Sequence, residues 1–199
     1  MPFLLALLVA AAAPEPGLRL PAFSLQDPRG RTFTAGDWKG RSVVLVVTAP
    51  TLDQGGAQES WSACLDPLEW PADGPVYAWL EDFSQSWFKD LAMGQLKAKY
   101  DPPPWFLIDA DGAVRRALGV PEGATWVLLY DAKGLLQAVE RGAPTPARAR
   151  ALWQRSLPGG PEEPVPTPGA SDISAVAAAP AAGLLFVGTA AGQLLRQPL

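Results

Sequence analysis

The chain has 199 residues, no histidine and a single cysteine, Cys64. Without histidine there is no Ser-His-Asp triad, no Cys-His pair and no imidazole metal ligand. One cysteine excludes an intramolecular disulfide, a Cys-x-x-Cys redox pair and a cysteine-rich zinc site. The 16 basic and 20 acidic residues leave a formal net charge of −4, which argues against non-specific nucleic-acid binding. We therefore expect no bound metal or cofactor and no nucleic-acid partner.

An uninterrupted apolar run, FLLALLVAAAA, covers residues 3–13 and is followed by a Pro-Glu-Pro-Gly segment. The run is too short to span a membrane but has the length of the apolar core of a signal peptide, and it ends in small residues that suit cleavage. No cysteine follows it for a lipid anchor. We predict that residues 1–13 are a signal peptide and that the mature protein is periplasmic or secreted, with no stable membrane anchor.

The central part of the chain alternates strand and helix signals. Residues 25–33 predict two short strands around a Pro-Gly turn, and the β-branched run at 42–47 predicts a central strand covered on both faces. The later signals, in chain order, are a helix over 58–65, a strand over 76–80, a helix over 86–100, a strand over 105–109, a helix or turn over 113–120, a hairpin of 126–130 and 135–139, and a helix over 146–157. This order predicts an α/β sandwich with a mixed sheet.

The last part of the chain changes composition. Residues 158–170, PGGPEEPVPTPGA, are almost wholly Pro, Gly and Glu and predict an extended linker. Residues 171–199 then contain short strand signals separated by turns, a pattern similar to one blade of a β-propeller. Because one blade cannot bury both of its faces, three alternatives stay open: a truncated propeller, a β-meander that docks elsewhere, and a coincidental Ala/Gly-rich meander.

Three segments carry a resemblance to a known family: LPAFSL at 20–25, WKGRSVVLVV at 38–47 and WVLLYDAKG at 126–134. In this order they resemble the thioredoxin-like superfamily, specifically its redoxin (AhpC/TSA-type) branch. Within that branch, PWFLIDADG at 104–112 and GAPTP at 142–146 look most similar to periplasmic YtfJ-type proteins. The resemblance covers residues 18–157. It implies a thioredoxin-like three-layer sandwich with a mixed central sheet, to which residues 171–199 would add a short C-terminal β-meander.

The resemblance also implies where redox residues would lie, and the chain lacks them there. Redox-active relatives place a Cys-x-x-Cys after the central strand, where the start of the next helix stabilises the thiolate. The corresponding positions are Leu52 and Gly55. The positions of the peroxiredoxin hydroxyl and cysteine fall on Gln54 and Ala57, and that of the family's cis-proline falls within residues 123–125. These absences predict a degenerate active site.

Cys64 is the chain's only thiol, and it lies beyond the usual nucleophile position, within the predicted helix at 58–65. Its sequence neighbours are apolar or neutral apart from Asp66, a setting that does not favour a thiolate. We interpret Cys64 as a small core residue. The alternatives are a one-cysteine redox role and an intermolecular disulfide.

Acidic pairs follow two of the predicted strands. Asp109 and Asp111, in Asp-x-Asp-Gly, look like the start of a calcium loop, but the next residues supply no further oxygen ligands, so we predict a turn. Glu81 and Asp82 follow the strand at 76–80, at the sheet edge where α/β proteins bind ligands. We predict that this pair is solvated surface, with a ligand role as the alternative.

The eight tryptophans are spread along the chain, and we expect most of them in the core. Trp61, Trp70 and Trp87 fall in helix or loop contexts. For these three the alternative is an apolar patch that binds a partner.

Together these observations predict a non-catalytic, exported thioredoxin-like binding or scaffold module of the cell envelope. Its partner would be another envelope protein or a small ligand. The candidate binding surface is the lost redox site, made of Thr48, Pro50, Leu52, Gly55, Ala124 and Trp126. The alternative is a weak redoxin, a thiol peroxidase or a thiol-disulfide exchange protein, acting through Cys64.

Overall fold

The computed structural model describes residues 14–49, 55–84, 86, 93–94, 96–98, 100–102 and 104–160, and the backbone of three strands within residues 173–198. The chain divides into two compact units, residues 1–160 and 161–199, and each is considered by itself. The predicted signal peptide, Pro50, Leu52, most of the predicted helix at 86–100 and most of the linker lie outside the described residues.

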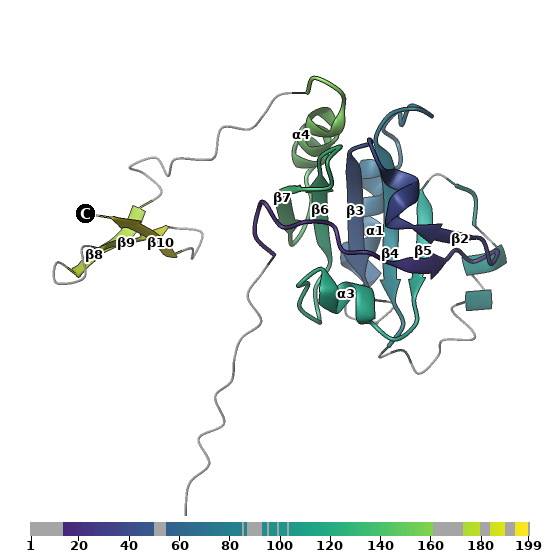
Figure 1. The fold of residues 1–199 in the computed structure, drawn as a ribbon, viewed down its shortest axis with the longest axis horizontal. Helices are drawn as coiled ribbons and strands as arrows, with labels where there is room; N and C mark the ends of the chain where they lie inside the picture. Colours follow the sequence, from purple (N-terminus) through teal and green to yellow (C-terminus); the bar gives the residue numbers. More distant parts are fainter. Residues whose placement is uncertain are drawn as a thin grey trace, which may run out of the picture. The chain divides into compact units, whose positions relative to one another are not determined.

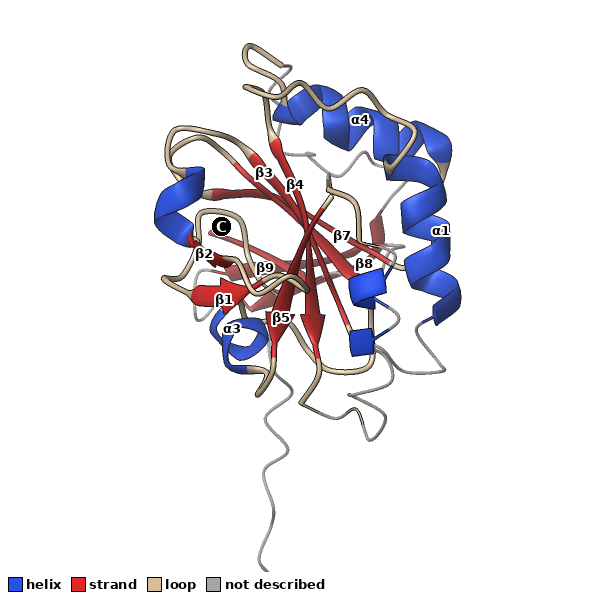
Figure 2. Ribbon diagram, turned by 90° about the vertical axis from the view of Figure 1, so that its right-hand side faces the viewer, coloured by secondary structure: helices blue, strands red, loops and turns tan. Residues whose placement is uncertain are grey.

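The first unit is a mixed sheet with helices on both faces (Figures 1 and 2). Its elements are β1 (Ser24–Gln26), β2 (Thr32–Thr34), the 3-10 helix η1 (Ala35–Trp38), β3 (Val43–Thr48), α1 (Gly55–Leu65), β4 (Val76–Asp82), β5 (Trp105–Asp109), α3 (Ala113–Ala117), β6 (Trp126–Tyr130), β7 (Leu136–Arg141) and α4 (Pro146–Ser156). This arrangement confirms the predicted α/β sandwich.

The strands lie in the order β2-β1-β5-β4-β3-β6-β7. β3, β4 and β5 are parallel, whereas β6 pairs antiparallel with β3 and β7 antiparallel with β6. The β6–β7 connection is tight because Asp131 Oδ1 accepts the backbone N–H groups of Lys133 and Leu135, at 2.9 and 2.8 Å, and Gly134 adopts a φ of 74°. The sequence Asp-Ala-Lys-Gly therefore forms the predicted hairpin turn.

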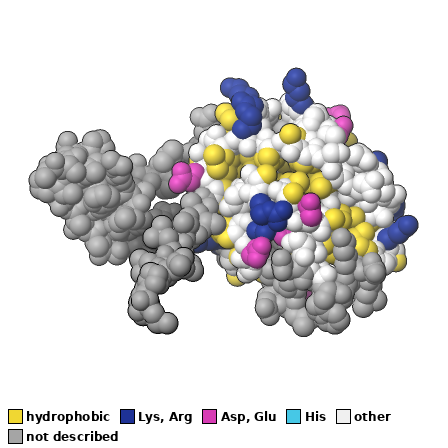
Figure 3. Space-filling model, turned by 60° about the horizontal axis from the view of Figure 1, so that its bottom comes forward, with side chains coloured by type: hydrophobic (Ala, Val, Ile, Leu, Met, Phe, Trp, Pro, Cys, Tyr) yellow, Lys and Arg dark blue, Asp and Glu magenta, His cyan; other side chains and the backbone are white. Residues whose placement is uncertain are grey.

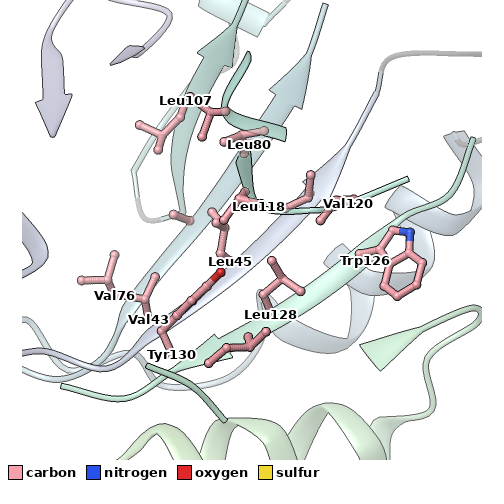
Figure 4. Close-up of a cluster of buried hydrophobic side chains, with 14 of the residues drawn as sticks. Val43, Leu45, Val76, Leu80, Leu107, Leu118, Val120, Trp126, Leu128 and Tyr130 are labelled. Carbon is pink, nitrogen blue, oxygen red and sulfur yellow. The ribbon is translucent and has the colours of Figure 1, made fainter. Parts of the chain in front are cut away.

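Two buried clusters fill the space on either side of the sheet. Alternate residues of a strand point to opposite faces, so β3 sends Val44 and Val46 to the face covered by α1 and α4, and Val43 and Leu45 to the other face. Figure 4 shows this second cluster, where Leu45 and Leu128 lie among side chains of several strands and of the segment after α3. Burial on both faces explains why β3 is continuously apolar.

Three elements, α1, β4 and β7, extend two or more residues beyond their predicted bounds, and β7 ends at Arg141, two residues after its predicted end. α1 begins at Gly55, three residues before the predicted start, and β4 ends at Asp82, two residues after the predicted end. The extension of β4 follows from its register: Glu81 pairs with Thr48 on one side and Ile108 on the other. Two acidic residues thus become part of the sheet.

The second unit is a three-stranded antiparallel meander of β8 (Ile173–Ala179), β9 (Leu184–Thr189) and β10 (Leu194–Pro198), in the order β10-β9-β8. A propeller blade has four strands, so the described part of this unit has one strand fewer. No helix within the described part of the chain is long and apolar enough to cross a membrane.

Candidate functional site

The three parallel strands end at one edge of the sheet, the edge next to α3 in Figure 1. Figure 3 brings this edge forward and shows apolar and charged side chains side by side on it. The carboxyl ends of parallel strands are where α/β proteins hold their ligands. Of the side chains at this edge, Thr48 and Glu81 lie on the α1 side of the sheet, and Asp82 lies on the α3 side, where Arg115 contacts it.

A hydroxyl pair joins the end of β3 to the start of β6. Thr48 Oγ1 and Thr125 Oγ1 are 3.1 Å apart and hydrogen-bonded, and both residues are buried. The antiparallel register of Val47 with Trp126 brings the two threonines together. Thr48 and Trp126 therefore lie beneath the surface, whereas Ala124 is exposed.

Glu81 is the most unusual group at this edge. Its residue is only 3% exposed, and Gln58 Nε2 of α1 donates a hydrogen bond of 2.5 Å to its Oε1. Burial disfavours the carboxylate and raises the pKa of Glu81 to about 7, although the hydrogen bond from Gln58 acts in the opposite direction. The prediction that Glu81 and Asp82 are solvated surface is wrong, because helices cover this edge of the sheet on both faces.

On the α3 side, Asp82 forms a buried ion pair. Its Oδ2 accepts from Arg115 Nε at 2.5 Å, and the Arg115 guanidinium also donates to the Val120 carbonyl at 2.7 Å and to Glu122 at 2.8 Å. Arg115 thus ties the end of β4 to the segment that leads to Ala124. The sequence offers no signal for this pair, because Arg115 lies 33 residues from Asp82.

Asp109 is fully buried beside this ion pair. Its Oδ2 accepts the Arg115 backbone N–H at 2.8 Å, while its Oδ1 has no hydrogen-bond partner among the residues that the structure describes. Burial raises the pKa of Asp109, and the backbone N–H groups of Arg115 and Val114 oppose that shift. The segment after Asp109 is the predicted turn, with Gly112 at a φ of 71° directly before α3. No group of three or more acidic or cysteine side chains in the described regions could hold a metal ion.

Cys64 lies away from this site. It is the second-last residue of α1, about 14 Å along the helix from Gly55 at a rise of about 1.5 Å per residue. Its side chain is half-buried and packs against the apolar cluster under α1 and α4. The structure therefore separates the thiol from the edge that holds Thr48, Thr125 and Glu81.

Most of the described tryptophans belong to the two buried clusters or pack against them. Trp61 is fully buried and its Nε1 donates to the Gly142 carbonyl at 3.0 Å. Trp70 is half-buried and stacks on Tyr77 with a centroid separation of 4.5 Å. The alternative of an exposed partner-binding patch is thus wrong for Trp61, and Trp87 lies outside the described residues.

No protein-family model matches the chain, and a search of curated proteins finds no match. Solved structures do match. The pneumococcal exposed lipoprotein thioredoxin of Streptococcus pneumoniae is 18% identical, covers 67% of this chain and 98% of its own, and has a TM-score of 0.52. StoA of Bacillus subtilis is 14% identical, covers 69% and 99%, and has a TM-score of 0.54. A protein described as the thiol:disulfide interchange protein DsbE of Chlorobium tepidum is 23% identical, covers 71% and 94%, and has a TM-score of 0.52.

These likenesses show that the first unit has a thioredoxin-like fold, as the resemblance implied. The sheet order and the helices on its two faces agree with that assignment. A likeness at such low sequence identity shows the fold of the first unit and not its chemistry, which depends on the side chains at the edge of the sheet.

Proposed function

We propose that this chain is an exported thioredoxin-like binding or scaffold module of the cell envelope that performs no thiol chemistry at the edge of its sheet. Leu52 and Gly55 stand at the positions where redox-active relatives have cysteines. The partner would be another envelope protein or a small ligand that contacts the surface around Ala124. The PWFLIDADG segment, which forms β5 and the turn after it, supports a closer kinship with YtfJ-type proteins as part of this proposal.

One observation carries the proposal: the only thiol of the chain lies at the far end of α1 from the site. Thiol exchange needs a thiolate in contact with the substrate, and helix N-termini stabilise thiolates. Cys64 lies near the C-terminus of α1, while the described edge holds the buried side chains of Thr48, Thr125 and Glu81, with Ala124 exposed next to Thr125.

The binding surface is tested with a matched pair of variants. The full chain, Ala124→Arg and Ala147→Arg would be immobilised and exposed to envelope extract and to a library of small envelope metabolites. Both alanines are exposed, and Ala147 lies on α4. We expect at least one species to bind to the wild type and to Ala147→Arg but not to Ala124→Arg. Equal binding by all three proteins, or no specific binding, would overturn it.

The alternative function, a weak one-cysteine redoxin, is favoured by the partial exposure of Cys64. A redoxin would consume peroxide or reduce insulin disulfides, and Cys64→Ala would abolish that turnover. The binding module instead predicts equal, background rates for the wild type and Cys64→Ala. Titration of the thiol with a disulfide reagent across pH reports directly whether Cys64 is reactive.

Export is part of the proposal and has its own test. It is supported by the apolar run at 3–13 and by the description of the Streptococcus pneumoniae structure as an exposed lipoprotein. Residues 1–20 fused to a β-lactamase that lacks its own leader are expected to confer ampicillin resistance on bacterial cells. Sensitivity of cells that express the fusion would contradict export.

A further inference from the structure

A buried tyrosine on the α1 side of the sheet is hydrogen-bonded to an acid at the surface. Tyr77, the second residue of β4, is 2% exposed. Its hydroxyl donates to Oδ1 of Asp66 at 2.6 Å, a length typical of a hydrogen bond to a carboxylate. Asp66 directly follows α1 and is exposed, so its carboxyl group connects the phenol to water. The pair therefore offers a proton a path out of the core.

Two further hydrogen bonds hold this pair in place. Trp79 Nε1 donates to the Tyr77 oxygen at 2.9 Å, and Ser62 Oγ donates to the other carboxyl oxygen of Asp66. Burial and the hydrogen bond to Asp66 raise the pKa of Tyr77, so the phenol keeps its proton at neutral pH. Because a phenol that has lost an electron becomes a strong acid, oxidation of Tyr77 is favourable only if its proton leaves in the same event. Asp66 is in place to accept that proton.

The ring of Tyr77 also has an aromatic contact that leads towards the surface. Trp70 is half-buried and stacks on it, with ring centroids 4.5 Å apart and an interplanar angle of 15°. Trp70 Nε1 donates to the Leu65 carbonyl at 3.0 Å, which fixes the indole over the phenol. Rings stacked at this distance are in direct π contact, so an electron can pass from Tyr77 to Trp70. The electron and the proton thus have separate routes.

The other two tyrosines of the chain are placed differently. The Tyr130 hydroxyl lies among the apolar side chains of the cluster in Figure 4, and within the described residues no carboxyl group is hydrogen-bonded to it. The guanidinium of Arg29 lies over the ring of Tyr100, 5.4 Å from its centroid. A cation in this position opposes the loss of an electron from the ring. Among the described tyrosines, Tyr77 is therefore the one that combines a proton acceptor with an electron path.

We infer that Tyr77 is a redox-active residue, which a one-electron oxidant at the surface oxidises through Trp70 while the hydroxyl proton passes to Asp66. The oxidant gains one electron, Tyr77 becomes a neutral phenoxyl radical, and Asp66 takes the proton and returns it to water. A peroxyl radical is a suitable oxidant, because it takes the electron and a proton from water and leaves as a hydroperoxide. Burial shields the phenoxyl radical from solvent, and the N–H group of Trp79 stabilises its oxygen. This activity uses residues outside the candidate site and does not rest on the proposed binding function.

The experiment oxidises the full chain at neutral pH by flash photolysis. Ruthenium(III) tris(bipyridine), formed in the flash with methyl viologen as the electron acceptor, is the one-electron oxidant. Optical absorption and electron paramagnetic resonance distinguish phenoxyl from indolyl radicals. The wild type is expected to form a phenoxyl radical as its indolyl radicals decay, and Tyr77→Phe is expected to form indolyl radicals alone. Tyr130→Phe is the matched control and is expected to behave as the wild type.

Two further variants separate the route of the proton from that of the electron. Asp66→Asn keeps the size of the side chain but makes it a far weaker base, so the phenoxyl radical is expected to form about ten-fold more slowly or less. Trp70→Leu removes the stacked ring, keeps the proton acceptor and is expected to slow the same step. Since Asp66 is exposed, Asp66→Asn also decides the matter if circular dichroism finds Tyr77→Phe unfolded. The inference is overturned if the wild type gives no phenoxyl radical, if folded Tyr77→Phe retains it, or if either Asp66→Asn or Trp70→Leu forms it as fast as the wild type.

Discussion

Arg115 and Asp82 form an ion pair with an Nε–Oδ2 distance of 2.5 Å, and both side chains are almost completely buried. The pair joins α3 to the end of β4, and the same guanidinium holds the Val120 carbonyl and Glu122. Because Val120 and Glu122 precede the loop of Ala124 and Thr125, the position of that loop depends on Arg115. The shape of the candidate site is thus set by a side chain outside it.

Replacement of Arg115 by Met is expected to lower the free energy of unfolding by about 3–5 kcal/mol, because it leaves Asp82 buried without a counter-charge. Urea denaturation followed by circular dichroism measures the loss. The double variant Arg115→Met with Asp82→Leu removes both charges and is expected to recover a large part of it. A loss below about 1 kcal/mol in the single variant would mean that the pair behaves like an exposed one.

Glu81→Gln is expected to remove a pH dependence of stability. The pKa of Glu81 is raised from 4.5 to about 7 in the folded state. The buried carboxyl therefore does not destabilise the wild type below about pH 4.5, and the wild type loses stability progressively between about pH 4.5 and about pH 7. A shift of this size corresponds to about 3 kcal/mol at alkaline pH. Urea midpoints of the two proteins should agree below about pH 4.5, diverge between about pH 4.5 and about pH 7, and differ by a constant amount above that, with Glu81→Gln the more stable. Curves that stay parallel over the whole range would contradict this origin.

The Thr48–Thr125 hydrogen bond can be measured by a double-mutant cycle. Thr125→Val is expected to cost about 1–2 kcal/mol because it leaves the buried Thr48 hydroxyl unpaired. In the double variant with Thr48→Val, the loss should be smaller than the sum of the single losses, with a coupling of about 1 kcal/mol. Additive losses would show that the two hydroxyls do not stabilise each other.

Gly112 and Gly134 offer a matched comparison of two glycines with positive φ, 71° and 74°. A Cβ at Gly112 would lie 2.9 Å from Ser84 Oγ and 3.0 Å from Asp82 Oδ1, whereas at Gly134 its nearest contact is 3.8 Å. We expect Gly134→Ala to cost about 1 kcal/mol for its backbone alone, and Gly112→Ala about 2–3 kcal/mol, since the crowding adds to the strain. Thermal unfolding of both variants checks the difference; equal losses would refute the crowding.

Local sequence patterns were sufficient to predict most of the helices and strands of the first unit. The β-branched run at β3 and the turn residues after β6 are short-range signals, so the order of elements and the mixed sheet followed from them. The ends of α1 and β4 were less well predicted. From the sequence, Glu81 and Asp82 resemble loop residues because they are acidic. Their pairing with β3 and β5 keeps them in the strand.

The sequence by itself determined which chemistry is absent: with no histidine and one cysteine, neither a catalytic triad nor a disulfide pair can form in this chain. The tertiary structure alone decided which groups meet in place of that chemistry. Thr48 meets Thr125 across 77 positions of sequence, and Gln58 meets Glu81 across 23. Such contacts depend on sheet register and on helix packing, which bring together residues that share no local pattern. Burial then raises the pKa of Glu81, a shift that its position in the sequence does not reveal.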